Sequence, residues 1–163
     1  MSKASSAIPS SKSGEALYRE MRTNFDYSQI LWTMQRYNRE MTQDKANELL
    51  KAFLQWMSLT PANGKDDYVV MFQSPVEEAF HCFVLNTRLY ETFCERFLGD
   101  FFHHDPLVDE EGPEVERLAW YTVNALEREF GDDLHMELRE WRKQLESGQC
   151  KVACVGPGGH CQK

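Results

Sequence analysis

Residues 74–99 read SPVEEAFHCFVLNTRLYETFCERFLG, and this stretch decides the predicted fold. Ser74 is followed by Pro75, and Glu77 stands three residues after the serine, which is the capping-box pattern at the start of a helix. Gly99 is a typical helix end. Apolar residues occupy one side of this predicted helix (Phe80, Phe83, Val84, Tyr90, Cys94 and Phe97) and also the opposite side (Leu85, Leu89 and Phe93). The pattern therefore predicts one continuous helix that is the most buried in its domain.

Apolar repeats on the N-terminal side of this helix predict further helices. Apolar residues recur at intervals of three and four over 14–38, as on one or two short helices, with a break in register near Asp26. The clearest amphipathic helix follows Thr42, whose side chain suits an N-cap, and ends at Pro61. The apolar run in 67–73 resembles a strand, but no partner strand is evident, so we interpret it as a packed loop.

Glycine and proline divide the C-terminal half of the chain. Residues 100–112 are expected to form a loop, and Pro113 opens a helix that ends at Gly131. A last helix ends at Gly148. After it the composition changes, because the remaining residues hold three of the five cysteines and three of the nine glycines.

The 163 residues suffice for one domain of ordinary size with a buried aromatic core. The predicted fold class is all-α, a single-domain irregular bundle of about five to six helices with flexible termini. We expect a flexible Ser-rich tail over 1–14, a helical domain over 15–148 and a Cys/Gly-rich tail over 149–163.

Charge and hydropathy exclude several classes of function. The chain has 26 acidic and 18 basic residues, a net charge of −8, and no basic run, which argues against nucleic-acid binding. No apolar stretch approaches the roughly 20 residues needed to cross a membrane. The N-terminal residues lack the apolar core of a signal peptide, so we expect a cytoplasmic protein with reduced cysteines.

Histidines and a glutamate in the central region suggest a metal site. Glu77 and His81 are four residues apart and share one helix face. His103 and His104 are adjacent in the predicted loop, where one of them is expected to face the protein, and imidazole is the commonest neutral metal ligand. Alternatively, His81 is a core histidine, one of the pair caps the preceding helix, and the other is solvated. A di-iron site is disfavoured because a second Glu-x-x-His motif is lacking.

The C-terminal tail contains a second candidate metal site. Cys150, Cys154, His160 and Cys161 offer four ligands within 12 residues, enough for tetrahedral zinc. Their spacing differs from that of a zinc knuckle. A reactive thiol tail, a disulfide formed on oxidation, or a segment modified by another enzyme are the alternatives.

A resemblance to a known family rests on two segments. The first runs from Val76 to Gly99 and comprises Val76–Tyr90, Phe93-Cys94 and Phe97-Leu98-Gly99, and the second is His103-His104-Asp105-Pro106. Both resemble the glycine-rich-domain-containing-protein-like family, whose bacterial members are small helical proteins with no established activity. The resemblance implies a helical fold and brings His81 close to the histidine pair, with Glu77 as a further ligand. Phe83 replaces the family's second histidine, which removes one ligand from any site that uses it.

No complete catalytic constellation can be written from these residues, so no catalytic residue is assigned. The sequence favours an accessory or interaction module whose Cys-rich tail binds a protein partner or is modified. The alternative is a zinc- or iron-binding helical protein, or an enzyme, that uses His81, His103 and His104. In a third hypothesis, the helical domain presents the tail cysteines to a modifying enzyme.

Overall fold

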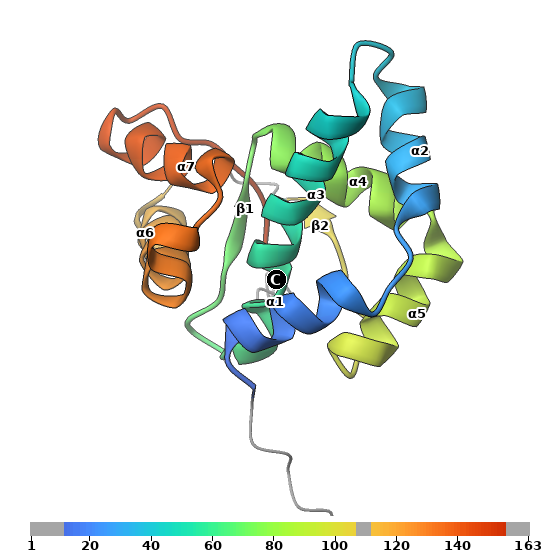
Figure 1. Cartoon of the computed structure of the whole chain (residues 1–163). Coiled ribbons are helices and arrows are strands. Elements are labelled where there is room, and N and C mark those ends of the chain that lie inside the picture. The colour runs from blue at the N-terminus through green and yellow to red at the C-terminus, as the bar shows by residue number, and fades with distance from the viewer. Residues whose placement is uncertain (1–11, 107–111, 156–163) are drawn as a thin grey trace, which may run out of the picture.

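The computed structural model describes residues 12–106 and 112–155, and within them the chain forms seven α-helices, two short 3₁₀ helices and three short strands (Figure 1). The α-helices are α1 (Gly14–Thr23), α2 (Ser28–Tyr37), α3 (Gln43–Met57), α4 (Pro75–Leu85), α5 (Thr87–Phe97), α6 (Pro113–Phe130) and α7 (Met136–Glu146). The 3₁₀ helices are η1 (Thr60–Ala62) and η2 (Gly131–Asp133). The strands are β1 (Val70–Phe72), β2 (Asp105–Pro106) and β3 (Val152–Val155).

Several predicted helix limits are confirmed. The register break near Asp26 separates α1 from α2. The Thr42 side chain accepts a hydrogen bond of 3.1 Å from the amide of Lys45 and so caps α3. Pro113 opens α6, and Gly131 follows its last residue with a positive φ of 50°. Among the described residues, no helix combines the length and the apolarity that crossing a membrane requires.

The prediction of one continuous helix over 74–99 is wrong, because Asn86 divides this segment into α4 and α5. The Asn86 side-chain amide donates to the carbonyl of Cys82 at 2.8 Å and to Thr33 Oγ1 of α2 at 3.0 Å. These bonds hold the break between α4 and α5 against α2. The break also turns Leu85 outward, so that one of the residues expected in the core is 59% exposed.

The capping box at the start of α4 is confirmed in its position but not in its hydrogen bonds. Ser74 is the N-cap residue and Pro75 is the first helical residue. The Ser74 hydroxyl makes no capping bond and is buried without a partner among the residues that the structure describes. Glu77, expected to complete the box, instead faces His81 one turn along the helix.

A small antiparallel sheet corrects the all-α prediction, and the fold is predominantly helical with this sheet at its centre. The strand order is β1-β3-β2, and Met71 and Pro106 both lie opposite Cys154 of β3. The missing partner of the apolar run in 67–73 is therefore β3, which belongs to the segment expected as a tail. Composition concealed this strand because it is only four residues long and is followed by glycines.

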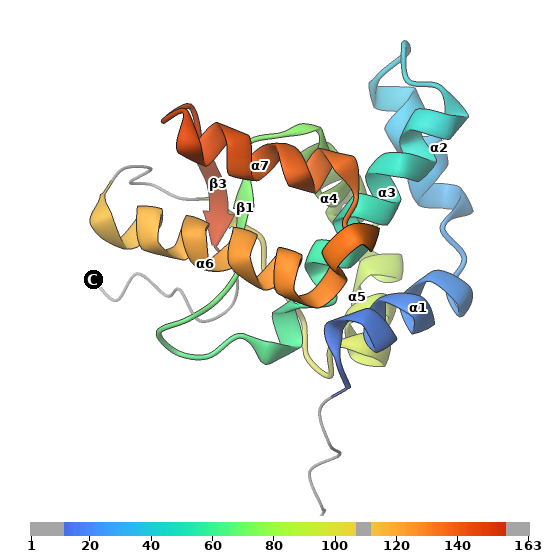
Figure 2. The same ribbon diagram turned by 60° about the vertical axis from the view of Figure 1, so that its left-hand side comes forward.

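Helices cover β1 from two sides. In Figure 1, β1 runs between α3 and the pair formed by α6 and α7, and Figure 2 shows β3 beside β1. The Val70 amide donates to Thr122 Oγ1 of α6 at 2.8 Å, while the Val70 carbonyl accepts from Trp56 Nε1 of α3 at 2.9 Å. Phe72 stacks on Trp141 of α7 with ring centroids 4.4 Å apart. The sheet thus joins α3 on one side to α6 and α7 on the other.

Candidate metal centre

Glu77 and His81 lie one turn apart on α4, as the sequence predicts. His81 Nε2 is 3.3 Å from Glu77 Oε1. The Glu77 side chain is only 19% exposed, whereas that of His81 is 53% exposed. The carboxylate therefore lies at the base of the pair and the imidazole lies at the surface.

His104 reaches this pair from the segment that links α5 to β2. The hydroxyl of buried Tyr90 donates to the carbonyl of Phe102, and Phe102 is itself buried. The His104 ring then packs on Phe80 of α4, with ring centroids 4.2 Å apart, and lies 4.8 Å from the His81 ring. Directly after His104, the pairing of β2 with β3 holds the C-terminal end of this segment in place.

The three side chains converge. One potential ligand atom from each of Glu77, His81 and His104 lies within 4.8 Å of the others. Across residues 12–106 and 112–155, this is the one group of three such side chains that comes together in this way. A metal ion at its centre would lie about 2 Å from each ligand atom, which requires only a small contraction of the group.

Burial shapes the protonation of the group. Burial raises the pKa of the Glu77 carboxyl, and the nearby His81 charge opposes that shift. Burial, assisted by the His81 charge, lowers the pKa of His104 to about 4. His104 is therefore neutral at pH 7 and able to bind a metal. Its Nδ1 atom is buried and has no hydrogen-bond partner among the described residues, and such an unpaired buried atom is unusual in a folded protein.

His103 does not join the group. Its side chain is exposed, and its ring contacts Phe101 with centroids 4.9 Å apart. The two adjacent histidines thus face different surroundings, since His104 is half-buried against Phe80. Of the four residues proposed from the sequence for this site, the structure brings three together.

The second candidate site has only two of its four residues in the described part of the chain. Cys154 is buried in β3, and burial raises the pKa of its thiol. Cys150 is half-buried, and burial raises the pKa of its thiol to about 11. His160 and Cys161 lie outside the described residues. The zinc site in this segment stays a prediction.

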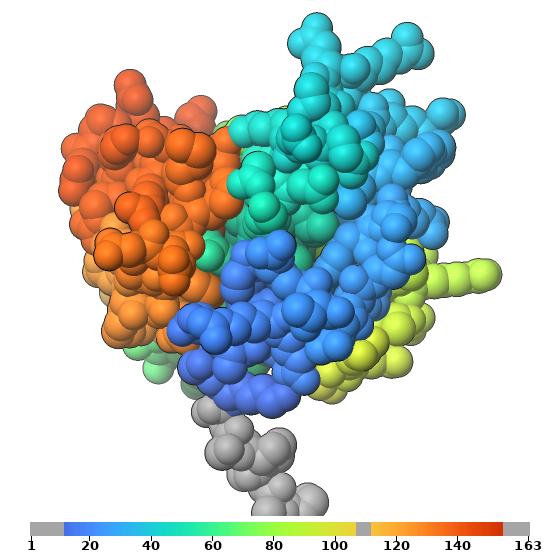
Figure 3. All heavy atoms as spheres, in the orientation of Figure 1, coloured from blue at the N-terminus to red at the C-terminus, as the bar shows by residue number. Residues whose placement is uncertain are grey.

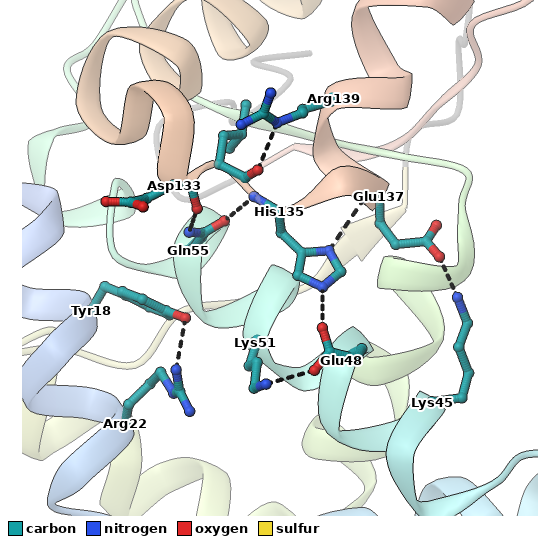
Figure 4. A network of polar contacts seen from close by, with 11 residues as sticks. Tyr18, Arg22, Lys45, Glu48, Lys51, Gln55, Asp133, His135, Glu137 and Arg139 are labelled. Atoms are coloured by element: carbon teal, nitrogen blue, oxygen red, sulfur yellow. Dashed lines mark hydrogen bonds and ion pairs between the residues drawn. The ribbon is translucent and has the colours of Figure 1, made fainter.

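His135 has a structural position between α3 and α7 (Figure 4). Its ring accepts from the amide of Glu137 at 3.2 Å and so caps α7, while Nε2 lies 2.8 Å from Glu48 Oε2. Gln55 accepts from the His135 amide and donates to the carbonyl of Asp133, both near 2.9 Å. His135 therefore connects α3 to α7, and none of these hydrogen-bond partners belongs to the candidate centre.

Sequence reasoning missed the residues that position His104. Phe80 and Phe102 are ordinary core residues by their pattern, and Tyr90 occupies an apolar position of a predicted helix. A buried tyrosine needs a hydrogen-bond partner, which is the one signal that could have pointed to the 101–106 segment. The hydrogen-bond partner of Tyr90 is the backbone carbonyl of a residue 12 positions along the chain. Every residue has such a carbonyl, so the sequence alone could not identify it.

A family model described as UCP032817-like matches residues 18–122. The chain belongs to the UCP032817-like family. This finding overturns the resemblance to the glycine-rich-domain-containing-protein-like family. No curated protein and no solved structure matches the chain.

Membership of the UCP032817-like family carries no activity with it, because the family is uncharacterised. The matched residues include Glu77, His81 and His104, and they extend into α6. They do not include Cys150 or β3. The candidate centre thus lies within the part of the chain that the UCP032817-like model matches. β3, which pairs with the strand directly after His104, lies beyond that part.

Proposed function

We propose that this protein binds a divalent transition-metal ion, zinc or iron(II), through Glu77, His81 and His104. The observation that carries the proposal is the convergence of these three side chains from two separate segments, α4 and the 101–106 segment. Two imidazoles and one carboxylate are the ligand set of many catalytic zinc sites and of non-haem iron(II) centres.

The protonation state of His104 supports metal binding. A metal ligand must be deprotonated, and the lowered pKa of His104 removes competition from protons at pH 7. Nδ1 of His104 is buried and has no partner among the described residues, and binding of the ion by this atom would account for that. The ion would replace the missing partner and neutralise the half-buried Glu77 carboxylate.

Three protein ligands leave at least one coordination position for water. His81 is more than half exposed, so small molecules have access to that position from solvent. A metal-bound water at such a site can become a nucleophile near neutral pH. The proposed centre is therefore of the open type found in metalloenzymes, in contrast to a closed structural zinc site.

A tail that presents reactive thiols is less well supported. Of its cysteines, Cys154 is buried and Cys150 is half-buried, and both have raised thiol pKa values. Reactive cysteines have accessible thiols with lowered pKa values. The role of Cys154 that the contacts support is a packed side chain in β3.

Metal content of the untagged full-length protein tests the proposal. After incubation with zinc and removal of free metal, inductively coupled plasma mass spectrometry should find about one ion per chain. The single variants Glu77→Gln, His81→Gln and His104→Gln should each weaken zinc binding at least about tenfold in competition with a chelating dye. The same measurements with iron(II) under anaerobic conditions distinguish the two metals.

His103→Gln is the matched control, because it removes an adjacent, exposed histidine that lies outside the group. We expect it to keep the ion. Cys154→Ala should also keep it. The proposal is overturned if the wild-type protein retains no metal, or if His103→Gln weakens binding as much as His104→Gln does.

A further inference from the structure

The middle and the C-terminal end of α2, together with the adjoining end of α4, expose large apolar side chains. Trp32 is 60% exposed, Tyr37 is 72% exposed and Leu85 is 59% exposed. Single exposed apolar residues are normal on a protein surface, but these three border two grooves that adjoin each other. α2 forms part of the face turned to the viewer in Figure 3, where it borders α1 and α3.

One of the two is an apolar groove of about 400 Å³ between α2 and α4. Met34, Met41, Cys82 and Leu85 supply its apolar lining. Methionine side chains are flexible and polarizable, and surfaces that bind varied apolar side chains commonly contain them. The volume is sufficient for one or two large apolar side chains of a partner.

The other is a basic groove of about 630 Å³ at the end of α2. Its lining includes Arg36 and Arg39 and no carboxylate. Within the described residues, neither arginine forms an ion pair with an acidic side chain. The Arg36 guanidinium instead lies over the Trp32 ring at 5.4 Å, which holds it in place. Tyr37 lines both grooves and joins them into one surface.

We propose that this surface, which we call the α2–α4 docking surface, binds an acidic peptide segment of a partner protein. An apolar side chain of the peptide occupies the apolar groove, and its carboxylates pair with Arg36 and Arg39. Charge complementarity supports this occupant, because the basic groove gathers two arginines and no carboxylate on a chain whose net charge is −8. Tryptophan, tyrosine and arginine are also the residues that contribute most energy at protein interfaces.

The composition of the apolar groove favours a peptide over a nucleic acid. Glu78 lines this groove, so a phosphate backbone that followed both grooves would meet a carboxylate. An apolar side chain of a peptide carries no charge for the Glu78 carboxylate to repel. The same carboxylate can accept a hydrogen bond from a backbone amide of the peptide. The peptide therefore lies with its acidic end at Arg36 and its apolar residue toward Leu85.

Selection of random 12-residue peptides displayed on phage against the full-length protein tests this surface. The enriched peptides should combine Asp or Glu with Leu, Phe or Met, and their affinities can be measured by fluorescence polarization. The charge reversal Arg36→Glu with Arg39→Glu should weaken their binding about tenfold or more, and so should Leu85→Asp. All three residues are exposed, and circular dichroism checks that these variants keep their helices.

Lys65→Glu with Arg88→Glu is the matched control, because it makes the same change in net charge at exposed residues that line neither groove. It should leave binding unchanged. The proposal is overturned if no peptide is enriched, if enriched peptides lack acidic residues, or if the Arg36/Arg39 reversal leaves their affinity intact.

Two further outcomes assign the surface to another occupant and overturn the proposal as well. One is binding of a 12-nucleotide oligothymidine that Arg36→Glu with Arg39→Glu abolishes and no enriched peptide displaces. The other is self-association in sedimentation equilibrium that Leu85→Asp abolishes. His81 lines the apolar groove, whereas Glu77 and His104 line neither groove, so all of these measurements are made on metal-free protein in the presence of a chelator.

Discussion

Pro106 of β2 lies opposite Cys154 of β3 in the antiparallel sheet, two residues after His104. Through this pairing, a strand far along the chain holds the segment that carries one of the three candidate metal ligands. β3 contributes no ligand to the group itself. Its role in the site is therefore to hold the His104 segment in position, and removal of β3 is expected to disturb the centre without deleting any of its ligands.

Truncation of the chain after Gly148 should lower both stability and zinc affinity. It removes the buried side chains of Val152 and Cys154 and leaves β1 and β2 unpaired. Loss of two buried side chains costs about 3 kcal/mol or more, which urea unfolding monitored by circular dichroism can measure. A chain that ends at residue 155 keeps all three strands and is the control. Equal stability of the two truncated chains would contradict the role assigned to β3.

Thr122→Val should destabilise the fold by about 1–3 kcal/mol, because it leaves the buried Val70 amide without its acceptor. The side chains are nearly equal in volume, so the loss reports mainly on the hydrogen bond. Thr92→Val is the control, since the Thr92 hydroxyl is exposed and bonds only within its own helix. Its effect on the free energy of unfolding should stay within about 0.5 kcal/mol. A neutral Thr122→Val would show that Val70 finds another acceptor.

Asn86→Ala should cost about 1–2 kcal/mol of stability, because two hydrogen bonds of the side-chain amide are lost. Thr33→Val removes the acceptor on α2, along with the bond that the Thr33 hydroxyl donates to the Gln29 carbonyl, and leaves the bond from Asn86 to Cys82 in place. In the Thr33→Val background, Asn86→Ala should therefore cost less than in the wild type, and a double-mutant cycle of urea unfolding measures the difference. Strict additivity would mean that Asn86 and Thr33 do not interact.

The metal-free protein should lose stability as the pH falls from about 6.5 toward 4. The unfolded chain binds a proton at His104 with the ordinary pKa of 6.5, whereas burial lowers the folded-state pKa to about 4. Between these values the unfolded state holds more protons, so acid favours unfolding. In His104→Gln this part of the pH dependence should disappear, while His103→Gln should retain it. Thermal unfolding at half-unit steps of pH gives the comparison.

The limits of the helices could be predicted wherever local chemistry sets them. Thr42 caps α3 through its own side chain, and Pro113 and Gly131 bound α6 through backbone conformation. The break at Asn86 could not be predicted, because its cause is a bond to Thr33 on another helix and apolar residues continue on both sides. Tertiary contacts overrule local periodicity at that point.

The sheet illustrates the same limit. The apolar run that forms β1 was evident, but its partner β3 follows about 80 residues later within a short segment of weak pattern. The sequence indicated Glu77 and His81 through their helical spacing alone. It could not distinguish His103 from His104, because only the packing of His104 on Phe80 separates them. A four-residue site was therefore expected where three residues meet.

The strand order β1-β3-β2 also has a consequence for synthesis of the protein. The middle strand is the last of the three to be made, so neither outer strand has a neighbour until residue 155 has left the ribosome. At roughly 5–20 residues per second, the nascent chain carries two open strand edges for several seconds after β2 has been translated. Helices can form during that interval, but the C-terminal end of the His104 segment becomes anchored only when β3 emerges and inserts between β1 and β2.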